Sequence, residues 1–134
     1  MTTKDPDAID LYVGQRVRAR RVAMGMSQEK LADALGLTFQ QVQKYEKGTN
    51  RISCSKLVVI ARALRTHPAY FFEGLPDDGS APAPEHHDFL AMMGTRHGSQ
   101  ICAIWPAIEE AGQGGLIVTV AQLVASAPSA KQAA

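Results

Sequence analysis

The sequence predicts an all-α protein that consists of a compact helical domain, a linker and a helical tail. Apolar residues recur at helical spacing through most of the first 64 residues, and a Ser or Thr suited to be an N-cap precedes three of the periodic segments. Glycines follow several of these segments, where a left-handed residue commonly ends a helix. Hydrophobic residues make up 46% of the 134-residue chain and charged residues 20%, so the chain can bury a core.

Five helices are expected before residue 75, each with its own start signal. Ser27 and Ser53 suit the N-caps of the second and fourth helices, and the spacing from Thr38 to Gln41 matches a capping box at the start of the third. Pro68 stands at the first position of a short fifth helix. The expected helices cover residues 9–24, 28–35, 38–47, 54–64 and 68–73.

A stretch rich in Pro, Asp, Ala and Gly separates this domain from an apolar tail. The tail pattern predicts short helices at 88–93, 99–111 and 116–125, with an interruption near Pro106, although the run LIVTV also suits a buried strand. The expected organisation is a flexible arm (1–8), a helical domain (9–74), a linker (75–87), a tail (88–126) and a disordered end (127–134).

The near-neutral net charge of +1 hides an uneven distribution. Residues 12–65 hold eleven Lys or Arg against three acidic residues, a net charge of +8, whereas residues 66–134 carry −5 and the first eleven residues −2. Such a basic segment in an otherwise acidic chain favours a polyanionic partner, most simply nucleic acid, and the alternative is a solvated basic face.

Several classes of protein fit the sequence poorly. No apolar run reaches the length of a membrane span, and the acidic, polar N-terminus differs from a secretory signal. Cys54 and Cys102 lie far apart, as expected for a reduced cytoplasmic protein. An S-x-x-K sequence at Ser53 lacks its companion catalytic motifs, and the histidines match no zinc-site spacing. We therefore expect no catalytic residue, no metal and no cofactor.

The second and third helices meet the packing requirements of a helix-turn-helix. Ala32 is small enough for the next helix to cross closely, and Gly36 can adopt the positive φ of the turn. Leu37 supplies the apolar residue after the turn, and Val42 can anchor the following helix to the core. The combination is specific, although each residue alone is a weak signal.

With Gln28, Leu31, Leu35 and Tyr45 added, these residues resemble the Cro/lambda-repressor-type helix-turn-helix regulators, the XRE family. The segment GMSQEKLADALGLTFQQVQKYEKGTNRIS carries the resemblance, which covers about residues 12–74. It implies a five-helix lambda-repressor-like domain that binds double-stranded DNA, usually as a dimer on a two-fold operator. The THP entry to the fifth helix and the Gly-rich GQGG depart from the family pattern.

The resemblance also assigns roles on the recognition helix, whose N-terminal residues face the bases of the major groove. Gln40 can pair with adenine, Lys44 can donate to guanine and Phe39 can pack on a thymine methyl. Gln41 can contact a base or bond its own helix terminus through the capping box. The expected base contacts are Phe39, Gln40, Gln41 and Lys44.

Contacts to the DNA backbone are expected on both sides of the recognition helix. Gln28 begins the helix that crosses the phosphates, and the loop after the recognition helix lies against the backbone by family resemblance. The expected backbone contacts are Gln28, Gln43, Thr49, Asn50 and Arg51. The resemblance further implies that Arg21 and Glu46 form a structural pair. We expect Arg16, Arg18 and Arg20 to add to the positive electrostatic potential from a distance and not to contact DNA directly.

The tail run LIVTVAQLV is apolar on nearly every face and must be buried. We expect two chains to bury their tails against each other in a homodimer, which would set the recognition helices about 34 Å apart. These expectations describe a cytoplasmic, nucleoid-associated transcriptional regulator, most simply a repressor. Contact with RNA polymerase stays open, and the alternative is an autoregulating antitoxin whose tail binds a toxin.

Overall fold

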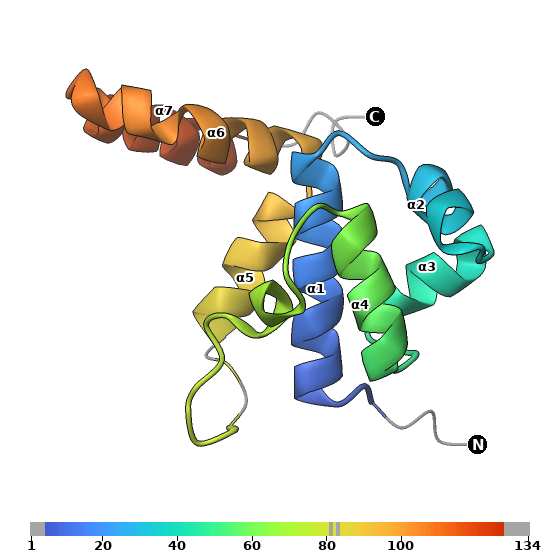
Figure 1. Cartoon of the computed structure of the whole chain (residues 1–134). Coiled ribbons are helices and arrows are strands. Elements are labelled where there is room, and N and C mark those ends of the chain that lie inside the picture. Colours follow the sequence, from blue (N-terminus) through green and yellow to red (C-terminus); the bar gives the residue numbers. More distant parts are fainter. Residues whose placement is uncertain (1–4, 81, 83, 128–134) are drawn as a thin grey trace, which may run out of the picture. The chain divides into compact units, whose positions relative to one another are not determined.

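The computed structural model describes residues 5–80, 82 and 84–127, and its regular elements in these ranges are all helical (Figure 1). The expected all-α class is therefore confirmed. The elements are α1 (Ala8–Ala23), α2 (Gln28–Leu35), α3 (Phe39–Glu46), α4 (Cys54–Ala63), the 3-10 helix η1 (Pro68–Phe72), α5 (Pro84–Met93), α6 (Arg96–Glu110) and α7 (Gly114–Ser126). The chain forms two compact units, divided between residues 100 and 101.

Side-chain caps explain where the helices of the first unit begin. The side chain of Asp7 accepts a hydrogen bond from the backbone N–H of Ile9, so α1 starts one residue earlier than expected. The Ser27 and Ser53 hydroxyls accept from backbone N–H groups of α2 and α4, and Thr38 caps α3. These polar caps satisfy N–H groups that the helices leave without partners.

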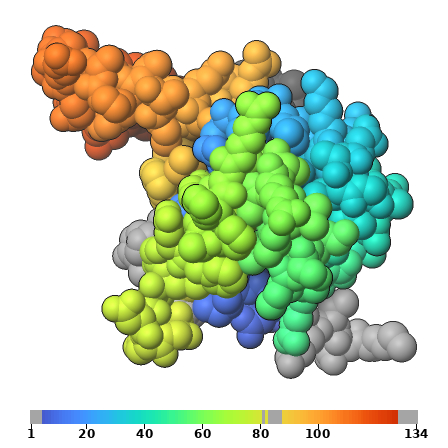
Figure 2. Space-filling model, in the orientation of Figure 1, coloured from blue at the N-terminus to red at the C-terminus, as the bar shows by residue number. Residues whose placement is uncertain are grey.

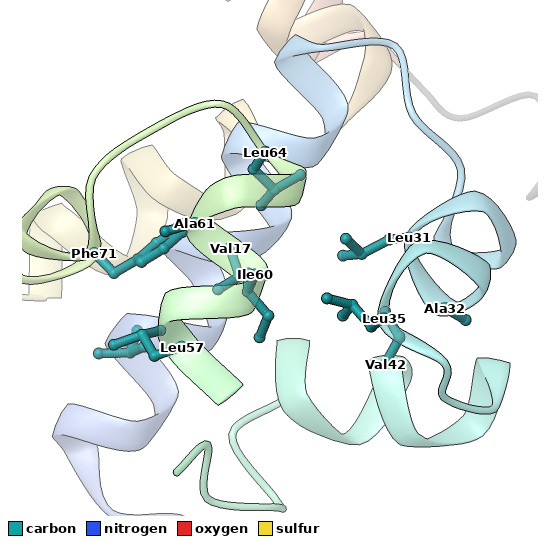
Figure 3. Close-up of a cluster of buried hydrophobic side chains, with 11 residues drawn as sticks. Val17, Leu31, Ala32, Leu35, Val42, Leu57, Ile60, Ala61, Leu64 and Phe71 are labelled. Atoms are coloured by element: carbon teal, nitrogen blue, oxygen red, sulfur yellow. The ribbon is translucent and has the colours of Figure 1, made fainter. Parts of the chain in front are cut away.

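One hydrophobic core joins α1, α2, α3, α4 and η1. Leu31 and Leu35 extend from α2 toward Ile60 of α4 (Figure 3). Phe71 of η1 and Leu64 are fully buried in the same cluster. On the face shown in Figure 2, α4 and the segment that includes η1 lie over α1, which is the central helix of this unit. The core thereby fixes α2 and α3 on a common support.

Helix α5 differs from expectation because it begins at Pro84, inside the segment predicted to be linker. It lies along α1, where Leu90 is buried against Tyr12 and Ala19 (Figure 1). Gly94 comes close to the side chain of Arg18. The packing of Leu90 on α1 joins α5 to the first compact unit, which also holds α2 and α3.

The rest of the tail is also helical, as the pattern predicted, with one difference. Pro106 lies inside α6 and does not interrupt it, so the expected break is absent. The run LIVTV lies in α7, so the strand alternative is wrong. Helix α6 begins three residues before the expected start at residue 99, because the Thr95 hydroxyl accepts a hydrogen bond from the N–H of Gly98. Residues 1–4 of the predicted arm and 128–134 of the predicted disordered end lie outside the described residues.

Two arginines of α1 hold the end of the domain in place. Arg16 donates from Nη2 to the carbonyl oxygen of Tyr70 at 2.6 Å and lies 4.0 Å from the Tyr70 ring centroid. Arg20 donates to the carbonyl oxygen of Leu64 at 3.0 Å. The expected role of these two side chains as remote contributors of charge is therefore incomplete, since both tie α1 to the segments around η1.

Candidate nucleic-acid interface

Helix α3 presents a row of exposed side chains from a fixed backbone. Val42 is 1% exposed in the core, so its helix face is held inward. Phe39, Gln40 and Lys44 are exposed on the remaining surface, and Gln43 is half-buried. We call the exposed set Phe39, Gln40 and Lys44 the recognition surface. It joins an apolar ring, an amide and a cation, three groups that can read base edges.

The turn between α2 and α3 sets the angle between these two helices and so the orientation of the recognition surface. Gly36 has a φ of 64°, a left-handed conformation that is unfavourable for residues with a Cβ atom. It ends α2, and its N–H donates to the carbonyl oxygens of Ala32 and Asp33. The N–H of Leu37 donates to the carbonyl oxygen of Ala32 at 2.9 Å. Ala32 itself is buried, as the close crossing of two helices requires.

Gln41 is engaged by its own helix terminus. Its Oε1 accepts from the backbone N–H of Thr38 at 3.0 Å, and its N–H donates to the Thr38 hydroxyl at 3.2 Å. Both halves of the capping box are therefore present. This geometry favours the capping role of Gln41 over the base contact, the two roles that the sequence left open.

A buried ion pair lies beneath the interface and connects three helices. The Glu46 carboxylate accepts two bonds from Arg21, at 2.5 and 3.0 Å, and both residues are buried. Gln28 donates to the same carboxylate at 2.7 Å, and Arg21 also donates to the Met26 carbonyl oxygen. The side chain of Gln28, expected at a phosphate, is thus bonded inward at the start of α2.

The loop after α3 is organised by one carbonyl group. The Lys44 carbonyl oxygen accepts from the backbone N–H groups of Thr49 and Asn50, and from the Thr49 hydroxyl at 3.2 Å. Arg51 projects further, with its side chain 78% exposed, and its Nε donates to Asp10 at 3.0 Å. All three loop residues lie at the surface beside the C-terminal end of α3.

Sequence reasoning missed two residues of this region. Gly14 is buried where α1 meets the end of α3, and a methyl group there would overlap the Tyr45 carbonyl oxygen and lie 2.9 Å from that of Glu46. The signal was a glycine inside an otherwise helical pattern. Lys47 is exposed at the C-cap of α3, and its position one residue beyond the helix could have marked it as a candidate phosphate contact.

The interface residues thus gather into two groups on the first compact unit. Phe39, Gln40, Lys44 and the loop Thr49–Arg51 are exposed, whereas Arg21, Glu46 and Gln28 form the support beneath. Among the described residues, no group of three His, Cys, Asp or Glu is placed to hold a metal ion. None of the helices in the described ranges is both long and apolar enough to span a bilayer.

Comparison with known proteins agrees with this geometry. Residues 17–71 match the helix-turn-helix family model. The chain is 53% identical over 81 residues to an uncharacterised HTH-type transcriptional regulator of Sinorhizobium medicae, covering 60% of this chain and 58% of that protein. A similar regulator of Sinorhizobium fredii is 57% identical over 72 residues, covering 54% of this chain and 50% of that protein.

A more distant relative is the HTH-type transcriptional regulator DicA of Escherichia coli. It is 28% identical over 75 residues, which cover 56% of this chain and 54% of that protein. The chain thus spans between half and two thirds of the length of these curated relatives. No solved structure matches the chain significantly.

Proposed function

We propose that the chain is a sequence-specific, DNA-binding transcriptional regulator of the XRE type, a proposal supported by the helix-turn-helix match of residues 17–71 and by the similarity to HTH-type transcriptional regulators. The observation that carries the proposal is the recognition surface, an exposed apolar, amide and cationic row on a capped helix whose opposite face is buried. The major groove of B-DNA admits a helix of this kind. Such a regulator acts in the cytoplasm, where bacterial DNA lies.

In this proposal the recognition surface reads bases. Gln40 pairs with adenine, Lys44 donates to guanine and Phe39 packs against a thymine methyl group. Gln41 stays with the helix terminus, where it stiffens the start of α3. The backbone contacts come from Gln43 and the loop Thr49–Arg51, together with the free N–H end of α2 beside Gln28.

We further propose repression by a dimer that occupies an inverted repeat and excludes RNA polymerase. The support for a dimer is α7, in which no residue is buried although most of its side chains are apolar and none is charged. Two copies that cover each other through this helix would present two recognition helices one turn of B-DNA apart, about 34 Å.

Selection of bound duplexes from a random pool tests the proposal directly. We expect an enriched inverted repeat. Gln40→Ala should then lose preference at one position of each half-site and weaken binding by about 1–3 kcal/mol, as removal of a base contact does. Arg51→Ala should weaken all sequences about equally and flatten the dependence on salt.

Gln100→Ala is the matched control, since Gln100 is exposed on α6 outside the proposed interface. It should leave the selected sequence and the affinity unchanged. A pool without an enriched motif would contradict sequence-specific binding. An unaltered preference in Gln40→Ala would remove Gln40 from the reading residues and leave the rest of the proposal standing.

A further inference from the structure

Arg51 is held by an acidic side chain of the same molecule at the place where the proposed interface would meet phosphate. We propose that Asp10 determines how strongly the protein binds DNA of any sequence, because it competes with phosphate for Arg51. This inference rests on the proposed function. It gives Asp10 the role of an affinity-determining residue that contacts Arg51 and no base.

The geometry favours competition over a fixed structural bond. Arg51 Nε donates to Asp10 Oδ2 at 3.0 Å, while the Arg51 side chain is 78% exposed and that of Asp10 is 27% exposed. The guanidinium can therefore turn to a new partner, whereas the carboxylate is less free. An exposed pair of this kind contributes little to stability, so exchange for another anion costs little.

Asp10 is also positioned by elements that the interface itself needs. It lies in the first turn of α1, and α1 is held against the end of α3 by the close contact at Gly14. Arg51 follows α3 in a loop anchored on the Lys44 carbonyl oxygen. The distance between the acid and the loop is thus set by the same packing that orients α3.

The surroundings of the pair add negative charge on the same side. The residues that line an open cleft of about 220 Å³ include Asp5, Asp7 and Asp10 together with Thr49 and Arg51. Asp7 is already engaged, because its Oδ1 accepts from the N–H of Ile9 at 2.8 Å. A phosphate that approaches Arg51 must therefore displace Asp10 from the guanidinium, and it also comes near the negative charges that line the cleft.

The consequence concerns overall affinity. Phosphate contacts supply nearly all of the affinity for DNA of arbitrary sequence, and base contacts supply the discrimination. An internal competitor for one phosphate-binding cation weakens binding to every sequence by a similar factor. The protein then dissociates more readily from any DNA, while the discrimination supplied by the base contacts of α3 is unchanged.

The test is a double-mutant cycle on the full chain. Affinity for a random-sequence 30-base-pair duplex is measured by fluorescence anisotropy for the wild type, Asp10→Asn, Arg51→Ala and the double variant. We expect Asp10→Asn to bind about twofold to fivefold more tightly, the gain that release of an exposed ion pair allows. In the Arg51→Ala background the same change should have no more effect than removal of an unrelated charge.

Asp33→Asn is the matched control for charge. Asp33 is exposed on α2, forms no ion pair among the described residues and loses the same unit of charge. Thermal melts of all variants establish that each is folded during the measurement. An Asp10→Asn effect equal in both backgrounds, or equal to that of Asp33→Asn, would overturn the inference while leaving the proposed function intact. A folded wild type that binds no duplex at all would overturn both.

Discussion

At the scale of single residues, the Glu46 carboxylate connects α1, α2 and α3, the helices that support the candidate interface. It lies at the C-terminal end of α3, where the helix dipole disfavours an anion, and it is 4% exposed. The two bonds from Arg21 and the one from Gln28 offset both costs. The carboxylate therefore fixes the ends of α1 and α2 relative to α3.

Replacing Glu46 with Ala should reduce the free energy of unfolding by about 3–5 kcal/mol, because the Arg21 guanidinium would be left buried without its partner. Urea unfolding followed by circular dichroism measures this change. Gln28→Ala removes one neutral donor from the same carboxylate and should cost only about 1–2 kcal/mol. A loss below 1 kcal/mol in Glu46→Ala would show that the pair contributes no more than an exposed one.

The roles of individual polar residues could be predicted from the sequence only when their partners are near in the chain. Thr38 and Gln41 are three residues apart, and their capping box follows from spacing alone. Gln28 and Glu46 are 18 residues apart, so the inward bond of Gln28 depends on how α2 and α3 pack. Gly14 was missed for the same reason, since its contact is with the backbone of α3.

At the scale of helices, start signals determined most of the architecture. The predicted bounds of α2 agree with the structure, and the caps Ser27, Thr38 and Ser53 lie where spacing placed them. The start of α5 was missed because Pro84 follows a stretch rich in Pro, Asp, Ala and Gly, a composition that predicted a linker. Local rules thus predicted the helices, and tertiary contacts determined which of them belong to the first compact unit.

The Thr38 cap should stabilise α3 and keep its first turn in place. Thr38→Ala removes the hydroxyl that accepts from Gln41, and we expect a loss of about 1 kcal/mol in the free energy of unfolding. Urea unfolding checks this value. Thr119→Ala is the control, because the Thr119 hydroxyl bonds to the Gly115 carbonyl oxygen of its own exposed helix and caps nothing. Equal stability of wild type and Thr38→Ala would contradict the capping role.

At the scale of the whole molecule, the described residues of the second compact unit, 101–127, include many apolar side chains but no buried residue. Helix α7 carries no charged residue and has no buried one, and Leu116, Leu123 and Val124 are each more than half exposed. Soluble monomers rarely leave a contiguous apolar surface of this kind in water. The basic stretch 12–65, with its net charge of +8, lies in the other unit, so the sequence separates a basic segment from an apolar part suited to self-association.

We expect the full chain to be a dimer at micromolar concentration and Leu123→Lys to shift it toward monomer, because a charge in an apolar interface must be desolvated. Sedimentation equilibrium measures the mass. Gln122→Lys is the matched control, since it adds the same charge at the neighbouring position without removing an apolar side chain.

The weakened dimer should also bind an inverted repeat less tightly than wild type while its affinity for a single half-site is unchanged, because the two recognition helices are then no longer joined. An unchanged dimer mass in Leu123→Lys would remove α7 from the interface. If the wild type were a monomer, the exposed apolar helix α7 would have to bind another protein. The regulator would then have to recognise single half-sites.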